Sequence, residues 1–418
     1  MINFLNDLNK PRTYLLIGNV LLVFFLILLN NLKVLPLRAG DFFFFTFLAL
    51  AFALYRPGWA FLLFIGMIPI ENINLAPAEL GMNIRPYQFL GALIVLAIVI
   101  RLASKRLSFK LAKPAWHDWL VVVFAVSGFP GIINAPDKLS SLKLAVISGT
   151  FAVIYFLVRT YIRNTEDLKR TIPFFLSSSM IVVFYGLWQN WAYLHKFPHF
   201  ETMPGRPNAT FTEADWLGLF LTVLSSAICA LMFHWNEDKE NRKAACPSRS
   251  KLCQIASGGS FLYLFLTFIF ILLIITVARS AWLGVLTALA VFLFIILTRL
   301  RLANWHWRDA LMTAVKISSA VLVALAAIYF YHLTDFQLFN RVQSTGSKLQ
   351  QITIACVPCT DYGKNECQWK PFPIKEKVIV DENNKLEDYN CRHIDLEERK
   401  TELAKGNYIS TAFRKDPN

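Results

Sequence analysis

The stretch TVARSAWLGVL (276–286) decides how the chain is read, because it places an arginine between two long apolar runs. The run before it is FLYLFLTFIFILLIIT (261–276), and the run after it is VLTALAVFLFIILT (285–298). Apolar runs of this length are suited to crossing the hydrocarbon core of a lipid bilayer. Two such runs joined by a short turn predict a membrane helical hairpin, with Arg279 in its turn.

The same reading extends to the whole chain. Of its 418 residues 56% are hydrophobic and 17% are charged, whereas a soluble domain carries about 25% charged residues. The sequence therefore predicts an all-α polytopic membrane protein with about eleven transmembrane helices. The candidate spans lie at about 14–32, 41–55, 58–70, 86–100, 116–133, 141–158, 171–194, 213–234, 260–277, 281–298 and 310–332.

The net charge of +14 does not indicate nucleic-acid binding, because of where the charge lies. Residues 333–418 hold 13 Lys and Arg against 13 Asp and Glu, so the excess belongs to residues 1–332. There it falls in short connections between spans, as expected of residues that set membrane orientation. We therefore exclude nucleic acid as a partner and take the lipid bilayer as one.

The distribution of Lys and Arg predicts a cytoplasmic N-terminus. With that orientation every second connection is cytoplasmic, and these segments together carry 20 Lys and Arg. We expect a multi-pass protein of the cytoplasmic membrane, with a membrane domain at 1–332 whose motif core is about 198–298. Residues 333–418 would form an extracytoplasmic, partly helical tail.

Four cysteines fall in this tail: Cys356, Cys359, Cys367 and Cys391. An outside location favours two disulfides among them, with three possible connectivities. The alternative is a zinc site made from these thiols and His393, but the gap between the third and fourth cysteine fits no zinc-ribbon spacing. We favour disulfides and expect no metal.

Two of the predicted spans begin at the outer face, near Thr212 and Ser280. The N-terminus of a helix attracts anions through its free N–H groups and dipole, and an arginine precedes each start, Arg206 and Arg279. Paired guanidinium groups suit a diphosphate, which at a membrane surface implies a lipid-linked substrate. This interpretation requires the two spans to be neighbours. The alternative for Arg279 is an interfacial arginine that reaches toward water.

Two acids in FTEADW (211–216) are catalytic candidates, Glu213 and Asp215. A structural interpretation competes with this role. Thr212 and Asp215 have the spacing of a capping box, and acids in a first helical turn stabilise the helix dipole. We keep both acids as candidates for proton transfer.

The arginine motifs resemble those of O-antigen ligases and related surface-polysaccharide polymerases. GRPNATFTEADWLGLFL (205–221) is similar to the segment that precedes a central helix in this family. The matching positions are Arg206, Ala209, Thr210, Phe211, Asp215 and Gly218. TVARSAWLG matches a second signature at Thr276, Arg279 and Gly284, and RVQSTGSKLQQIT (341–353) resembles the segment after the following span. The sequence departs at Ala278, where the family often has Ser, and at Ala209, where it often has Gly.

The resemblance implies a glycosyltransferase made of membrane helices, without cofactor or required metal. Members move a glycan from a polyprenyl diphosphate to a hydroxyl of a glycan, lipid or protein acceptor at the outer face. Arg206 and Arg279 would hold the diphosphate and act in catalysis by stabilising the charge that develops as the glycan leaves. Thr210, Ser280 and Arg341 are further substrate-binding candidates. The resemblance also implies an acceptor-activating histidine in a larger outside region. CRHIDLEE (391–398) does not match that motif, so we expect the histidine and a closing span beyond residue 418.

Two other functions remain open. A transporter or flippase for a lipid-linked or anionic solute would also use outside arginines, but it should place polar groups deep in several spans, where Lys316 is nearly alone. A non-catalytic scaffold would bind a partner through its disulfide-bonded tail, and the arginines would then have no role.

Overall fold

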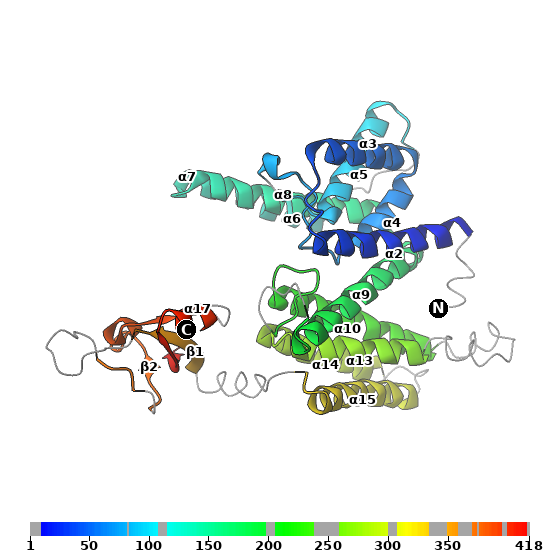
Figure 1. The fold of residues 1–418 in the computed structure, drawn as a ribbon. Coiled ribbons are helices and arrows are strands. Elements are labelled where there is room, and N and C mark those ends of the chain that lie inside the picture. The colour runs from blue at the N-terminus through cyan, green and yellow to red at the C-terminus, as the bar shows by residue number, and fades with distance from the viewer. Residues whose placement is uncertain are drawn as a thin grey trace.

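The computed structural model describes residues 10–81, 83–107, 115–197, 205–237, 259–299, 307–333, 349–357, 370–373, 376–394 and 399–415. Helices dominate these ranges, and a small sheet forms near the C-terminus (Figure 1). The helices are α2 (Lys10–Asn31), α3 (Ala39–Tyr55), α4 (Pro57–Met67), α5 (Pro86–Ala103), α6 (Trp116–Ser127), α7 (Gly131–Asn134), α8 (Lys138–Tyr161), α9 (Thr165–Leu194), α10 (Ala214–Glu237), α13 (Gly259–Ile275), α14 (Arg279–Arg299) and α15 (Trp307–Phe330).

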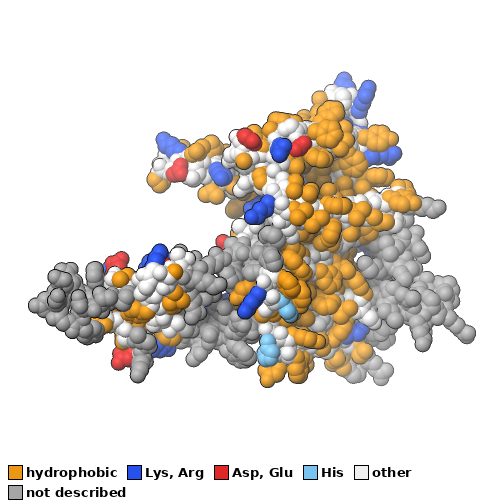
Figure 2. All heavy atoms as spheres, viewed as in Figure 1, with side chains coloured by type: hydrophobic (Ala, Val, Ile, Leu, Met, Phe, Trp, Pro, Cys, Tyr) orange, Lys and Arg blue, Asp and Glu red, His pale blue; other side chains and the backbone are white. Residues whose placement is uncertain are grey.

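Helices lie in each of the predicted spans, and together they define a membrane protein. Within the described residues, 7 helices are long and apolar enough to cross a bilayer. Four shorter apolar helices lie at Ala39–Tyr55, Pro57–Met67, Ser260–Ile275 and Arg279–Ile295. Apolar side chains cover most of the visible surface of the helical part (Figure 2), as expected where lipid replaces water. The number eleven and the membrane orientation stay predictions.

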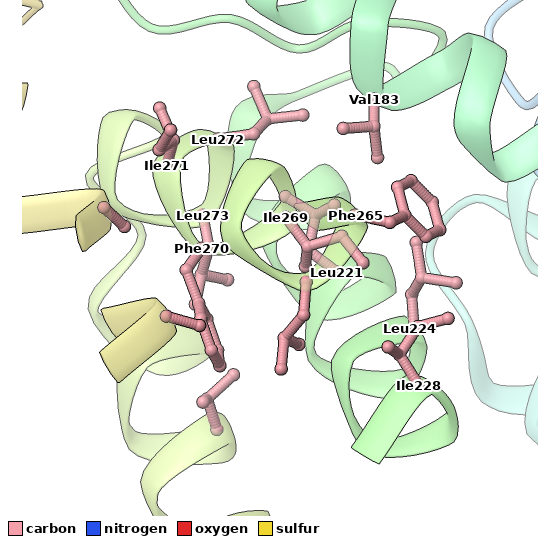
Figure 3. Packing of buried hydrophobic residues seen from close by; sticks show 14 of the residues in the cluster. Val183, Leu221, Leu224, Ile228, Phe265, Ile269, Phe270, Ile271, Leu272 and Leu273 are labelled. Atoms are coloured by element: carbon pink, nitrogen blue, oxygen red, sulfur yellow. The ribbon is translucent and has the colours of Figure 1, made fainter. Parts of the chain in front are cut away.

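The helices pack around two apolar cores that share α9. One core joins α9 to α2, α3, α4 and α5, with Phe64 and Ile94 fully buried. The other joins α9 to α10, α13, α14 and α15. In Figure 3, Ile269 and Phe265 of α13 lie between Val183 of α9 and the α10 residues. Helix α9 therefore forms a wall common to both cores and runs diagonally between the two helix groups in Figure 1.

Buried polar side chains line the helix contacts more fully than the sequence analysis expected. Lys316 is not nearly alone, because Asn19 of α2 is buried and its Nδ2 donates to Ser178 Oγ of α9 at 2.8 Å. Asp118 is also buried, in the first turn of α6, where it pairs with Arg159 in the last turn of α8 and accepts a hydrogen bond from Tyr155. Single polar residues inside a predicted span are hard to recognise from the sequence because most of the residues around them are apolar.

The tail contains a four-stranded sheet, so the all-α expectation is wrong for this part of the chain. The strands β1 (Leu349–Cys356), β2 (Ile379–Val380), β3 (Cys391–His393) and β4 (Tyr408–Lys415) lie in the order β2-β4-β1-β3. β1 is antiparallel to β3 and β4, whereas β2 is parallel to β4. Ile352, Ile354 and Cys356 alternate along β1 and are buried. This period of two is typical of a strand. The segment is too short and too polar to have been counted among the apolar spans.

A disulfide joins Cys356 to Cys391, which lie directly opposite each other in β1 and β3. The bond closes the edge of the sheet beside a small core that includes Phe372 and Ala412. It also takes both thiols away from the alternative zinc site. The other two candidates, Cys359 and Cys367, lie outside the described residues.

Candidate functional site

Helices α10 and α14 lie side by side and run in the same direction. At their N-terminal ends a Cβ placed on Gly218 would lie 2.7 Å from Ala281 Cβ. One turn further on, Thr222 Oγ1 donates to Ala281 O at 3.2 Å, and near the other end the rings of Phe233 and Phe292 pack at 6.1 Å. The two helix N-termini therefore meet at one face, as the interpretation from sequence requires.

Small residues make this close approach possible. A Cβ on Gly218 would also lie 2.9 Å from Ala278 Cβ, and one on Gly284 would lie 3.2 Å from Thr222 Cγ2. Small residues at such contacts let the backbones of membrane helices approach each other. The motif glycines at 218 and 284 thus serve the packing of α10 on α14.

Arg206 links the two motifs directly. Its side chain is 10% exposed. The Nε group donates to the carbonyl oxygen of Thr276 at 3.0 Å, in the turn between α13 and α14, and Nη2 donates to Asp215 Oδ1 at 3.0 Å in the first turn of α10. A cation at the end of α13 is also stabilised by the free carbonyls and dipole of that helix. Arg206 therefore fixes the start of α10 against the start of α14.

The loop that carries Arg206, which we call the Arg206 loop (205–213), is anchored on two further elements. The N–H of Ala209 donates to Gln189 Oε1 of α9 at 2.7 Å. Thr210 is buried, and its hydroxyl donates to the carbonyl oxygen of Pro69 at 2.6 Å. The carbonyl of Thr210 in turn accepts from the N–H groups of Glu71 and Asn72, at 3.0 and 2.7 Å. The structure therefore places Thr210, a predicted substrate-binding residue, inside the protein.

Two residues of this loop adopt left-handed backbone conformations. Gly205 has φ +74° and Ala209 has φ +48°. The left-handed region is open to glycine and costs other residues about 1 kcal/mol or more. The bond from its N–H to Gln189 helps to hold Ala209 in this conformation.

Glu71 is a site residue that the sequence analysis did not single out. Its Oε2 accepts from the N–H and the hydroxyl of Thr212, at 3.0 and 3.1 Å. Its Oε1 pairs with Arg85 Nη2 at 2.7 Å. Helix α10 begins at Ala214, and the carbonyl of Glu213 accepts the first helical bond from Leu217. A single acid in a connection between two helices forms no motif, and its pairing with Arg85 and Thr212 is apparent only from the structure.

The remaining predicted residues divide by position. Arg279 is the first residue of α14 and is half-buried, and Ser280 beside it is exposed. Glu213 and Asp215 are exposed at the start of α10, where Asp215 is held by Arg206. The structure thus gathers all four around the paired N-termini of α10 and α14. Arg341 lies outside the described residues.

At the α14 N-terminus Arg279 adds its charge to the free N–H groups of the first turn, an arrangement suited to phosphate oxygens. At the α10 N-terminus Arg206 is already paired with Asp215 and supports the turn before α14. The apolar helices place this site in a multi-span membrane protein. No protein-family model, curated protein or solved structure matches this chain.

Proposed function

We propose that the chain transfers a glycan from a polyprenyl diphosphate to an acceptor hydroxyl at the outer face of the cytoplasmic membrane. One observation carries the proposal: the bond from Arg206 to Thr276 joins two motifs that lie 70 residues apart in the sequence. Both motifs resemble those of O-antigen ligases and related polymerases. Their contact supports a single site built from both.

The two arginines have different roles in this proposal. Arg279 contacts the diphosphate, because it is the more exposed of the two and begins α14, where the free N–H groups of the first turn add to its charge. Arg206 is buried and acts mainly by orienting the turn at Thr276. A fixed guanidinium stabilises the negative charge that develops on the diphosphate as the glycan leaves.

The acids follow from the same geometry. Asp215 is engaged by Arg206 and belongs to the support of the site. Glu213 is exposed beside the α10 N-terminus and is the acid better placed to exchange a proton with a substrate. The described residues form the donor half of the reaction, and the resemblance assigns the acceptor to a histidine elsewhere.

A flippase or transporter of lipid-linked anions is the second candidate. The buried polar residues at the α2–α9 contact favour it, since polar groups inside spans often mark a substrate path. It differs from the first candidate in one respect: the carrier would cross the membrane with its glycan still attached.

Binding to a short carrier analogue tests the proposal without needing the acceptor. The full chain in detergent would be titrated with farnesyl diphosphate and with farnesol. Arg279→Ala should weaken diphosphate binding at least about tenfold. Arg38→Ala is the matched control, because Arg38 is an exposed arginine directly before the N-terminus of α3.

Each result decides between the readings. Equal binding by Arg279→Ala and wild type would mean that Arg279 does not hold the carrier diphosphate. The non-catalytic scaffold would then be the favoured function. If wild type binds, vesicles loaded with a fluorescent polyprenyl-diphosphate glycan separate the remaining two functions. Glycan found on an acceptor supports transfer, and intact donor found on the opposite leaflet supports the flippase.

A further inference from the structure

The connection between α4 and α5, described at 68–81 and 83–85, docks onto the Arg206 loop. The contacts are backbone bonds, in which the carbonyl of Thr210 accepts from Glu71 and Asn72, and the hydroxyl of Thr210 donates to Pro69. A segment 141 residues earlier in the sequence, counted from Pro69 to Thr210, therefore forms one wall of the loop that carries Arg206. This wall brings a carboxylate with it.

The carboxylate of Glu71 joins two helix starts. One oxygen pairs with Arg85, the residue directly before α5, and the other accepts two bonds from Thr212, just before α10. Its side chain is 15% exposed, whereas Thr212 is exposed, and these bonds are stronger than neutral ones because the acceptor is charged. Both oxygens are used, and a neutral amide could not accept at both.

The Glu71 bond and the Arg206 bond hold the same short segment at two points. Thr212 is bound by Glu71, and three residues later Asp215 is bound by Arg206. Arg206 also reaches the turn before α14. A change at Glu71 therefore passes through the start of α10 to the arginine that orients the α14 N-terminus.

We propose that Glu71 is a positioning residue of the anion site: it fixes Thr212 and thereby the Arg206 loop in the arrangement that binds a lipid diphosphate. This inference rests on the proposed function, since it names what prepares that site. Glu71 acts through Thr212 and Arg206 and does not itself contact the ligand, whose charge it would repel.

The test compares Glu71→Gln with Glu79→Gln in the full chain. Glu79 is an exposed residue of the same connection, in the short 3-10 helix Ala78–Leu80. Its variant therefore makes the same charge change but leaves the bonds of Glu71 to Thr212 and Arg85 in place. Farnesyl diphosphate binding and hydrogen exchange of the ligand-free protein are measured for both. Glu71→Gln should weaken binding about tenfold and speed exchange in peptides covering 205–217. Glu79→Gln should do neither.

A second variant follows the proposed route. Thr212→Val keeps the shape of the side chain but removes the hydroxyl that donates to Glu71. It should also weaken farnesyl diphosphate binding. The double variant Glu71→Gln with Thr212→Val should lose less binding free energy than the sum of the two single losses, because both changes affect the same Glu71–Thr212 contact.

The outcomes separate this inference from the proposed function. If Arg279→Ala weakens binding and Glu71→Gln does not, the site stands and the positioning role of Glu71 is overturned. Faster exchange spread equally over α10, α13 and α14 in Glu71→Gln would mean general loosening and would also overturn it. If wild type does not bind the diphosphate, or Arg279→Ala binds it equally well, both the site and its positioning residue fail.

Discussion

Gly218 of α10 and Ala281 of α14 approach each other so closely that a Cβ on residue 218 would lie 2.7 Å from the Ala281 Cβ. This contact holds α10 and α14 together near their N-terminal ends, and Arg279 is the first residue of α14. The space at residue 218 is thus a condition for the candidate site, and enlarging the side chain there should disturb both packing and binding.

Gly218→Val should lower the free energy of unfolding by about 1–3 kcal/mol, because the added atoms overpack the contact with Ala278 and Ala281. Thermal unfolding in detergent measures this. Gly18→Ala in α2 is the control, since no atom lies within 4 Å of a Cβ added there. Equal stability of the two variants would contradict the close approach of α10 and α14.

Arg206→Lys should destabilise the protein even though it keeps the positive charge. Arginine makes the bonds to the Thr276 carbonyl and to Asp215 from two different nitrogen atoms, whereas lysine has one nitrogen and lacks the rigid geometry that serves both. We expect a loss of about 1–3 kcal/mol in the free energy of unfolding. Unfolding that matches wild type would mean that the bond to Thr276 does not hold the turn.

Arg279→Lys should act on binding more than on stability. The planar fork of arginine meets two phosphate oxygens at once, and lysine meets them as a point charge. The affinity for farnesyl diphosphate should fall about tenfold while the melting temperature stays close to that of wild type. Full affinity in this variant would reduce Arg279 to a simple source of charge.

Removal of the disulfide by Cys356→Ser with Cys391→Ser should destabilise the tail sheet by about 2–4 kcal/mol. Hydrogen exchange of β1 and β4 should rise, and exchange of α10 and α14 should not change. In the wild-type protein, thiol reagents should label Cys356 and Cys391 only after reduction. Labelling without a reductant would contradict the bond.

Glu402 makes the tail sensitive to acid. Bonds from Lys405, Asn407 and Arg392 hold the pKa of Glu402 at about 2, below the ordinary 4.5. A carboxyl whose pKa is lowered on folding stabilises the fold above its unfolded pKa, and the contribution is lost as pH falls through the folded value. Protection of the β4 amides should therefore decrease between pH 4.5 and 2. Glu402→Gln should remove this pH dependence, and a slope equal to that of wild type would refute the assignment.

The helices could be predicted from the sequence because each contains a run of consecutive apolar residues. The run before Thr276 and the run after Arg279 each predict a helix without knowledge of any partner. The tail sheet could not be predicted in this way. Its strands β2 and β3 are two and three residues long and gain their order from pairing with β4 and β1.

The candidate site could be predicted in part. Arg206 and Arg279 stand out because charge is rare beside apolar runs, and each precedes the start of an apolar run in the sequence. The division of roles between them could not be predicted, since the burial of Arg206 depends on a bond to Thr276. Glu71 lay beyond sequence reasoning for the same cause, because its partner Thr212 is 141 residues away.

Helix α9 has a geometric consequence for how the protein sits in its bilayer. Its 30 residues correspond to a rod about 45 Å long, whereas the hydrocarbon layer is about 30 Å thick. The charged residues at its start, Glu166, Asp167, Lys169 and Arg170, belong in the headgroup region, and the rest is long enough to cross the layer with some tilt. Because both apolar cores are built on α9, the inclination of this one rod sets the angle at which the two halves of the protein meet the membrane plane.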